Sequence, residues 1–179
     1  MVRLMGENRF GSYISVPEKA RYSKGLDKPK VDCLLCAMVR RDKQVETKMV
    51  FEDDENMIVL NRFPYNPGHL LIFPKKHVEK LSELNDESLT SFFKLVKRSS
   101  ALLEKTYTPD GINLGINQGR ASGASVAHLH AHVVPRYANE TGFMEVLAGT
   151  RVIHETLDDT LKRLLANLDL LKRDSQQRA

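Results

Sequence analysis

The sequence predicts a single α+β domain built on an antiparallel sheet, and three observations support this. The chain has 179 residues, 41% hydrophobic and 28% charged, which suits one globular domain with a substantial core. Short apolar runs between turn residues indicate strands, and two stretches with apolar residues at helical spacing indicate helices. No repeat or linker divides the chain, so we expect an N-terminal arm over 1–30, one domain over 31–172 and a polar tail over 173–179.

The strands follow from apolar runs and the turns that bound them. Two runs flank five acidic or polar residues at 52–56, which predicts a hairpin with an acidic turn. Residues 64–68 read Pro-Tyr-Asn-Pro-Gly, a loop, and the next apolar run is stopped by Pro74. A Gly/Ser-rich loop spans 119–125. We expect strands at 48–51, 57–60, 69–73, 112–117 and 128–134.

Three helices complete the predicted domain. Residues 31–40 are expected to form a short helix that carries two cysteines. A longer helix is expected from a cap at Asn85 or Asp86 to about Lys105, because its apolar residues form one stripe. Leucines at helical spacing from Leu157 to Leu171 predict a final amphipathic helix.

The charge and the apolar runs exclude several classes of protein. Twenty-seven basic and 23 acidic residues give a net charge of +4, and no basic run is interleaved with aromatic residues. A dedicated nucleic-acid-binding module is therefore not indicated. No segment has the roughly 18–20 apolar residues of a membrane span, and the N-terminus lacks a signal-peptide core. We expect a cytoplasmic protein with reduced cysteines.

Three histidines alternate within an apolar run. On an extended strand His128, His130 and His132 share one face, while the apolar residues between them occupy the other. Histidine serves as nucleophile, proton carrier or metal ligand near neutral pH. A lone histidine in a sheet is usually an unreactive hydrogen-bonded residue, but three on one face indicate a site. Ligation of a catalytic metal by two or three of them is an alternative that the spacing leaves open.

The loop before these histidines suits a phosphate. Its glycines, Gly123 among them, allow close approach of the backbone to an anion, while Ser125 and Asn117 add polar side chains. An imidazole that attacks phosphorus forms a covalent phosphoramidate, and the central His130 is the natural nucleophile if a backbone carbonyl fixes its other nitrogen. His132 would then face the phosphoryl oxygens or the leaving group.

Cys33 and Cys36 have the C-x-x-C spacing of half a zinc site. His77, after a strand, and His128 can supply the other two ligands of a closed structural site that joins the first helix to the sheet. Two inert reduced cysteines are the alternative. His154 is expected to be a surface residue.

These motifs resemble the histidine triad (HIT) family of nucleotide hydrolases and transferases. The family pattern His-φ-His-φ-His-φ-φ, with φ apolar, matches 128–134 and is followed by Pro-Arg. Asn117-x-Gly119, Gly123 and Ser125 also match, as does the stretch 61–77, so the resemblance covers about 31–137. Residues 149–153 and the last helix resemble the diadenosine tetraphosphate phosphorylase branch.

The resemblance implies a HIT-like fold, with about five antiparallel strands and flanking helices, and a nucleotide cleft beside the sheet. His130 would take the nucleotidyl group through its α-phosphate, with His69 and His132 supporting the phosphate and the nucleophile. Asn61 would contact the ribose, and Asn117 and Ser125 the phosphates.

Bacterial relatives carry zinc on residues that match Cys33, Cys36, His77 and His128, and family members usually form homodimers. No organic cofactor is implied. Many relatives have glutamine where this chain has Ala124, which leaves the contact to the leaving group open.

The expected function is cleavage of dinucleoside polyphosphates through a nucleotidyl-His130 intermediate, with water or phosphate as acceptor. One alternative is a nucleotidyltransferase of the hexose-1-phosphate uridylyl type, which is typically longer and has a changed third histidine. Another is a nucleotide-binding regulator with little turnover.

Overall fold

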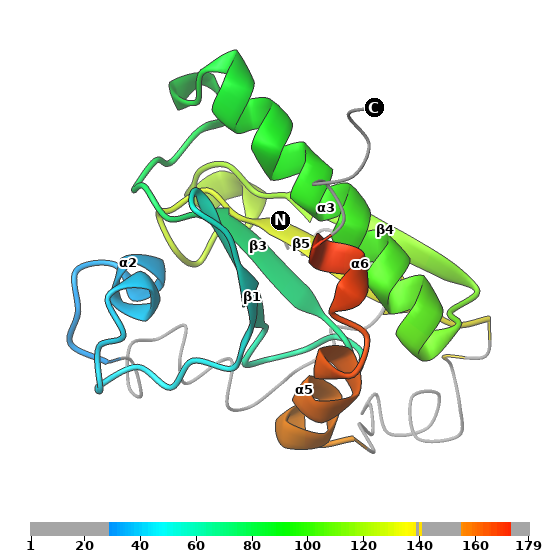
Figure 1. The fold of residues 1–179 in the computed structure, drawn as a ribbon. Coiled ribbons are helices and arrows are strands. Elements are labelled where there is room, and N and C mark those ends of the chain that lie inside the picture. Colours follow the sequence, from blue (N-terminus) through cyan, green and yellow to red (C-terminus); the bar gives the residue numbers. More distant parts are fainter. Residues whose placement is uncertain (1–28, 139, 141–154, 173–179) are drawn as a thin grey trace, which may run out of the picture.

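The computed structural model describes residues 29–138, 140 and 155–172, and it has a five-stranded antiparallel sheet at its centre (Figure 1). The strand order is β1-β2-β3-β5-β4, so β1 and β4 are the edges. The predicted α+β class and antiparallel sheet are confirmed. The strands are β1 (Met49–Glu52), β2 (Asn56–Leu60), β3 (Leu70–Pro74), β4 (Gly111–Ile116) and β5 (Ala131–Arg136).

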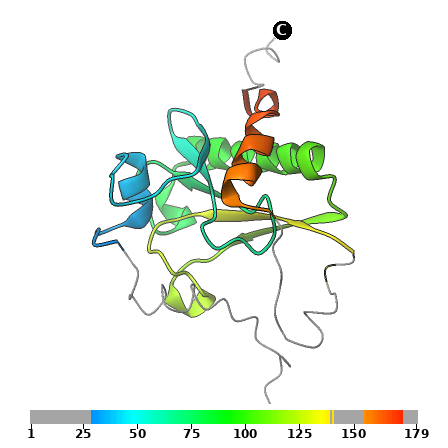
Figure 2. The ribbon, with the colours of Figure 1, turned by 90° about the horizontal axis from the view of Figure 1, so that it is seen from below.

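Helices cover the two faces of the sheet unequally. The long helix α3 (Asp86–Tyr107) lies across one face, together with α5 (Leu157–Leu165) and α6 (Asp169–Lys172) (Figure 2). The short 3-10 helix η2 (Arg120–Ser122) lies on the opposite side, and α2 (Leu34–Val39) packs against the β2–β3 part of that side. A second 3-10 turn, η1 (Leu81–Glu83), precedes α3. Among the described residues, the helices on the face opposite α3 are the short ones, α2 and η2.

Strand β2 is buried along its whole length because both of its faces are covered. Ile58 and Leu60 belong to the core under α3, while Met57 and Val59 pack with Leu35 of α2. A strand covered on both sides reads as a continuous apolar run rather than an alternating one. The sheet therefore lies between a large core on the α3 side and a smaller one on the α2 side.

The long helix is capped at its start by Asn85, one of the two N-caps that its sequence predicts. The side chain of Asn85 accepts a hydrogen bond of 2.8 Å from the backbone N–H of Ser88, and Asp86 and Glu87 occupy the first turn. The helix ends at Thr108, whose φ of 46° is left-handed. It runs two residues beyond the expected end, since Thr106 and Tyr107 remain helical.

Two predicted elements differ in extent. Strand β5 begins at Ala131, so of the three alternating histidines only His132 lies in a paired strand, and His130 and His128 belong to the segment before it. The single final helix predicted from Leu157 to Leu171 is wrong, because a turn at 166–168 separates α5 from α6. Both short helices contact α3.

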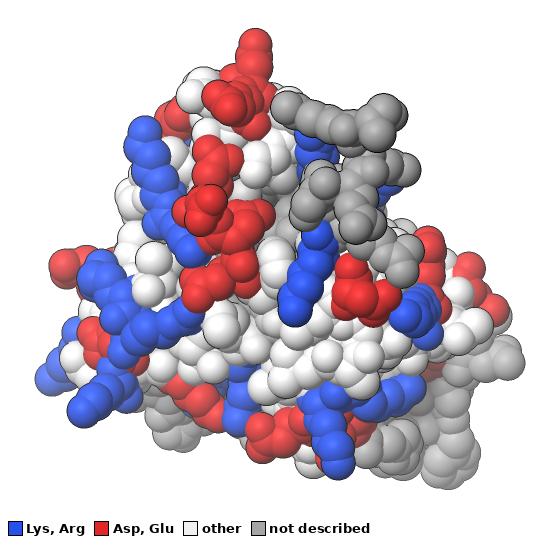
Figure 3. All heavy atoms as spheres, in the orientation of Figure 1, with Lys and Arg blue, Asp and Glu red and all other residues white. Residues whose placement is uncertain are grey.

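Some expectations fall on residues outside the described part. They concern most of the N-terminal arm, the tail 173–179, the stretch 149–153 and His154. Within the described ranges, no helix combines the length and the apolar composition that crossing a membrane requires. On the face seen in Figure 3, acidic and basic side chains are interspersed, in keeping with the small net charge.

Candidate active site and metal site

The candidate active site lies on the sheet face opposite α3. Ala131 and Val133 of β5 are buried in the core under that helix, so His132 between them projects to the other face. It pairs there with Leu71 of β3. A cavity of about 180 Å³ opens on this side. Its wall includes side chains of three kinds: apolar residues Leu34, Leu35, Met38 and Val126, polar residues Asn61, Asn117 and Ser125, and the imidazoles of His130 and His132.

His130 is held through one ring nitrogen. Its Nδ1 donates to the backbone carbonyl of His128 over 2.7 Å, and the residue is only 4% exposed. Burial lowers the pKa of His130 below its ordinary value. A neutral ring that donates from Nδ1 carries its lone pair on Nε2. The geometry thus presents an unprotonated nitrogen of the kind that a nucleophile or a metal ligand needs.

His132 forms a pair with His69. The backbone N–H of Tyr65 donates to Nδ1 of His69 over 3.1 Å, so in the neutral ring the proton is on Nε2. That Nε2 lies 2.9 Å from Nδ1 of His132 and donates to it. His132 consequently carries its own proton on Nε2. The buried His69 lies behind His132 and not in the cavity wall.

Asn61 lies at the junction of this pair and the cavity. Its side-chain oxygen accepts from the N–H of Phe63 over 3.1 Å, and its Nδ2 lies 3.2 Å and 3.3 Å from the two ring nitrogens of His69. The residue lines the cavity beside Arg62 and Phe63. Asn61 therefore reaches both the cavity and the histidine pair.

The glycine-rich loop borders the cavity as expected for a phosphate cradle. Asn117, Gly123 and Ser125 all line it. Gly123 has a φ of 94°, in the left-handed region that favours glycine, so a side chain here would strain the loop. A second cavity of about 220 Å³ shares Pro29, Leu34, Ser125 and Val126 with the first, and its wall also includes Asp32, Cys33 and Arg120 of η2.

Cys33, Cys36, His77 and His128 form a separate group, with their four ligand atoms within 4.8 Å of one another. The Sγ of Cys36 lies 3.2 Å from Nδ1 of His77 and 3.5 Å from Nδ1 of His128, and the Sγ of Cys33 lies 3.4 Å from the latter. Tetrahedral zinc with ordinary Zn–S and Zn–N bonds would place sulfur and nitrogen about 3.5 Å apart. The four side chains fit such an ion.

The rest of the group's chemistry also suits a metal. Nε2 of His128 lies 2.8 Å from the carbonyl of Pro74, to which it donates, so the lone pair on Nδ1 points at the cysteines. Burial lowers the pKa of His128 to about 4, which keeps the ring neutral. Burial and the neighbouring Cys33 raise the pKa of Cys36 to about 11. A bound cation would reverse that last effect by stabilising the thiolate.

The structure brings the sequence-predicted residues together in two groups that meet at His128. The ring of His128 joins the cysteine group, and its carbonyl holds His130. Two contributors were not predicted from sequence. The Tyr65 amide fixes the proton of His69, and the apolar residues of α2 form one wall of the cavity. A backbone amide leaves no signal in side-chain identity, whereas the α2 wall follows only from packing.

Comparisons with known proteins show which family the chain resembles. The profile of the HIT domain matches residues 42–139. The chain is 39% identical over 109 residues to the AP-4-A phosphorylase of Mycobacterium tuberculosis, which covers 60% of this chain and 55% of that protein. The chain thus spans about half the length of that relative. It is 36% identical over 132 residues to an uncharacterized HIT-like protein of Methanocaldococcus jannaschii, covering 74% of this chain and 98% of the other.

Solved structures of this fold resemble the protein over most of its length. A hypothetical histidine triad nucleotide-binding protein of Sulfolobus tokodaii aligns with a TM-score of 0.67 and 28% identity, covering 82% of this chain and 98% of the other. A Zn-bound histidine triad family protein of Mycobacterium smegmatis aligns with a TM-score of 0.66 and 27% identity, covering 78% and 95%. With the profile match across more than half of the chain, the protein belongs to the HIT domain family.

Proposed function

We propose that the protein is a nucleotidyl hydrolase or phosphorylase that cleaves dinucleoside polyphosphates through a covalent intermediate on His130. The observation that carries this proposal is the 2.7 Å hydrogen bond from Nδ1 of His130 to the carbonyl of His128, which leaves Nε2 as the nucleophilic nitrogen in the cavity wall. The likeness to an AP-4-A phosphorylase supports the choice of substrate.

The reaction has two displacements at the α-phosphorus. In the first, the lone pair of His130 Nε2 forms the P–N bond, and the bond from phosphorus to the bridging oxygen breaks with its electron pair on the leaving polyphosphate. In the second, an oxygen of the acceptor forms the new P–O bond and the P–N bond breaks with its electron pair on His130; when the acceptor is water, one of its protons passes to solvent. His130 then regains its lone pair. Water as acceptor makes the enzyme a hydrolase, and inorganic phosphate makes it a phosphorylase.

The neighbouring groups stabilise the charge that develops on the phosphate. His132 carries its proton on Nε2 because its Nδ1 accepts from His69, so it donates to a phosphoryl oxygen. Ser125 and Asn117 offer further donors at the cavity wall. In this proposal Asn61 contacts the ribose, and Gly123, which has no side chain, lets the phosphates approach the backbone closely. The base packs against the apolar residues of α2.

The second cavity supports a substrate with phosphates beyond the α-position. It adjoins the first through Ser125, and its lining includes the basic residue Arg120, whose side chain is suited to phosphate oxygens, together with the acidic residue Asp32. We assign this space to the leaving polyphosphate. Many relatives have glutamine where this chain has Ala124, and the methyl group of alanine cannot contact the leaving group. We propose that Arg120 makes that contact instead.

Zinc is proposed for the group of Cys33, Cys36, His77 and His128. Bound there, the ion would supply a structural crosslink between α2 and the segment that precedes β5. The protein itself orients the ligand side chains. The hydrogen bond from His128 to the carbonyl of Pro74 directs Nδ1 of His128 toward the cysteines, and Cys33 is the N-cap residue of α2. Ligation through thiolates requires reduced cysteines, which agrees with the expected cytoplasmic location.

We also propose that two copies associate through β4. This strand is an edge of the sheet, and Leu114 on it is 59% exposed, the most exposed of the large apolar side chains in the described residues. An unpaired strand edge with exposed apolar residues pairs readily with a second edge. Sedimentation of the protein and of Leu114→Asp tests this, because the variant should shift toward monomer. A monomeric parent protein would contradict the proposal.

The products of diadenosine tetraphosphate test the main proposal. If the acceptor is phosphate, we expect ADP and ATP when phosphate is present. If the acceptor is water, we expect AMP and ATP. Acid-quenched samples should contain a nucleotidyl-histidine that is missing from His130→Ala. Unchanged turnover in His130→Ala would contradict the covalent mechanism, and tight binding without any product would identify a nucleotide-binding regulator.

A further inference from the structure

Asn66 is a buried polar residue to which the mechanism above gives no role. It lies in the loop between β2 and β3 and is only 2% exposed. Its side-chain Nδ2 donates to the carbonyl of Pro135 over 2.6 Å and to Oε1 of Glu140 over 2.8 Å. Both amide protons are thus used, and they tie the loop to the end of β5.

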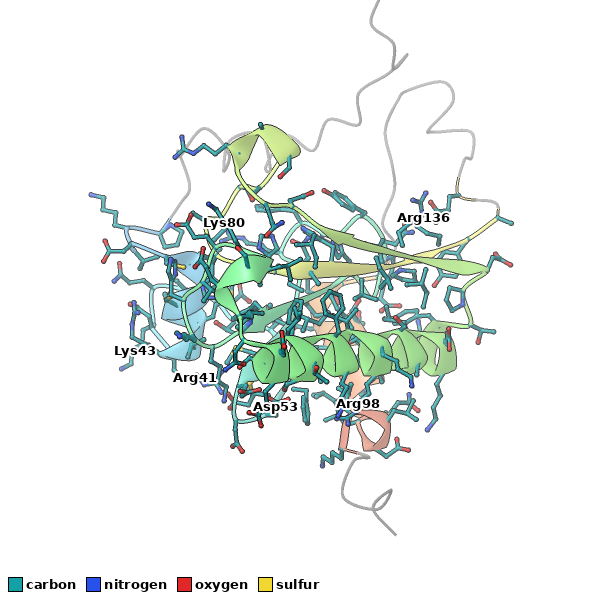
Figure 4. The ribbon with its side chains drawn as sticks, turned by 90° about the horizontal axis from the view of Figure 1, so that it is seen from above. Arg41, Lys43, Asp53, Lys80, Arg98 and Arg136 are labelled. Carbon is teal, nitrogen blue, oxygen red and sulfur yellow. The ribbon has the colours of Figure 1, made fainter. Side chains whose placement is uncertain are left out.

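Glu140, one of the two acceptors of Asn66, is held in place by an ion pair with Arg136. Glu140, whose side chain is 10% exposed, accepts two hydrogen bonds from Nε of Arg136 and one from its NH2 group, at 2.7–3.0 Å. The N–H of Tyr137 donates to the same Oε1 that Asn66 contacts. Arg136 also donates to Asn113 of the edge strand β4, at the end of the sheet far from α2 (Figure 4). Asn66 therefore contacts a carboxylate with little freedom to move.

The loop is closed on its other side by backbone and packing contacts. The N–H of His69 donates to the carbonyl of Asn66 over 3.1 Å. Gly68, between them, has a φ of 85°, and a Cβ at this position would lie 2.9 Å from the ring of Tyr107. The turn is thus closed by the hydrogen bond between His69 and Asn66, and its glycine packs against the Tyr107 ring where a side chain would not fit.

The position of this loop sets where one backbone amide points. Tyr65 immediately precedes Asn66, and its N–H donates to Nδ1 of His69. His69 and His132 face each other through Nε2 and Nδ1, so one proton can lie on either side of that contact. Asn61 does not choose between the two arrangements, because its Nδ2 is nearly equidistant from both ring nitrogens of His69. Among these contacts, only the one from the Tyr65 amide to Nδ1 favours one proton arrangement, the one with His69 protonated on Nε2.

We propose that Asn66 is a positioning residue that fixes the proton arrangement of the His69–His132 pair by holding the Tyr65 amide against His69. With that amide in place, His69 is protonated on Nε2 and His132 presents Nε2–H to the substrate. If the amide moves away, His69 can carry its proton on Nδ1, and His132 then loses its donor toward the phosphate. The catalytic consequence rests on the proposed function, whereas the proton arrangement does not.

The test is long-range proton–nitrogen NMR on histidine-labelled protein without substrate, applied to the parent protein and to Asn66→Asp. Aspartate keeps the size of the side chain. When ionised it donates to neither Pro135 nor Glu140, and when the neighbouring Glu140 carboxylate keeps it protonated it offers one proton where Asn66 offers two. We expect the parent to show Nε2–H forms of His69 and His132, and the variant to populate Nδ1–H of His69. Turnover of diadenosine tetraphosphate should fall about 10–100-fold in kcat, the usual cost of losing a supporting hydrogen bond, with KM nearly unchanged.

Glu140→Gln is the matched control, because glutamine keeps the acceptor oxygen that Asn66 and Tyr137 use. It should retain the parent's histidine forms. Identical forms in the parent and a folded Asn66→Asp would overturn the proposal. If Asn66→Asp does not fold, Asn66→Ala, which has no side-chain donor, replaces it under the same criterion. Normal proton forms without any turnover in the parent protein would instead contradict the proposed function alone.

Discussion

His128 and His130 are two residues apart and both are buried, yet the structure gives them opposite chemistry. In His128, Nε2 is hydrogen-bonded to the backbone carbonyl of Pro74, and Nδ1 faces two cysteines. In His130, Nδ1 is hydrogen-bonded to the backbone carbonyl of His128, so Nε2 is the ring nitrogen available to a substrate. The nitrogen that donates to the backbone thus differs between the two rings, which is why we propose a metal site for one and a nucleophile for the other.

The largest expected effect separates the two rings by activity. His130→Gln should reduce turnover of diadenosine tetraphosphate by about 10³-fold or more, since loss of a covalent nucleophile removes the main route of reaction. Metal content and unfolding temperature should stay close to those of the parent, because the contacts of the cysteine group do not involve this ring. Steady-state kinetics and elemental analysis check both. Loss of metal in this variant would break the distinction between the two sites.

The reciprocal change acts on the metal side. Cys36→Ser should abolish zinc binding and lower the free energy of unfolding by about 4 kcal/mol, a magnitude typical of a lost structural metal. Activity should fall less than in His130→Gln, because the carbonyl of His128 still accepts from His130. Elemental analysis and denaturant titration measure these effects. Parent protein that binds no zinc from a zinc-containing buffer would contradict the assignment.

A smaller effect comes from the protonation of His128. Because burial lowers its pKa to about 4 from the ordinary 6.5, the unfolded chain takes up this proton first as the pH falls. Metal-free protein should therefore lose stability between pH 6.5 and about 4, by at most about 1.4 kcal/mol per pH unit from this group. Urea titrations across this range should show a shallower slope in His128→Gln. Equal slopes would mean that the ring is charged in the folded protein.

The smallest expected effect concerns the second cavity. Arg120→Ala should raise the KM for diadenosine tetraphosphate about tenfold, as expected for one lost charge-assisted hydrogen bond. A nucleotide substrate with a compact, uncharged leaving group should be cleaved with unchanged constants. Lys94→Ala, an exposed basic residue on α3 and so on the other side of the sheet, is the control. Equal losses for both substrates would place Arg120 outside the leaving-group site.

Local patterns predicted most of the fold. The apolar runs located all five strands to within about two or three residues, and Asn85 marked the start of α3, because strands and caps depend on neighbours in the chain. The start of β5 and the break between α5 and α6 were missed. Both depend on partners elsewhere in the molecule, since pairing with β3 and β4 begins only at Ala131 and since α5 and α6 each pack on α3.

The sequence by itself determined which chemical groups the protein has: the alternating histidines, the C-x-x-C pair and a glycine loop beside them. It could not determine which ring nitrogen of each histidine carries a proton. That choice depends on the carbonyls of Pro74 and His128 and on the amide of Tyr65, three backbone groups that only the tertiary structure brings to the rings. Every residue has such groups regardless of its side chain, so their use is decided by folding and not by residue type.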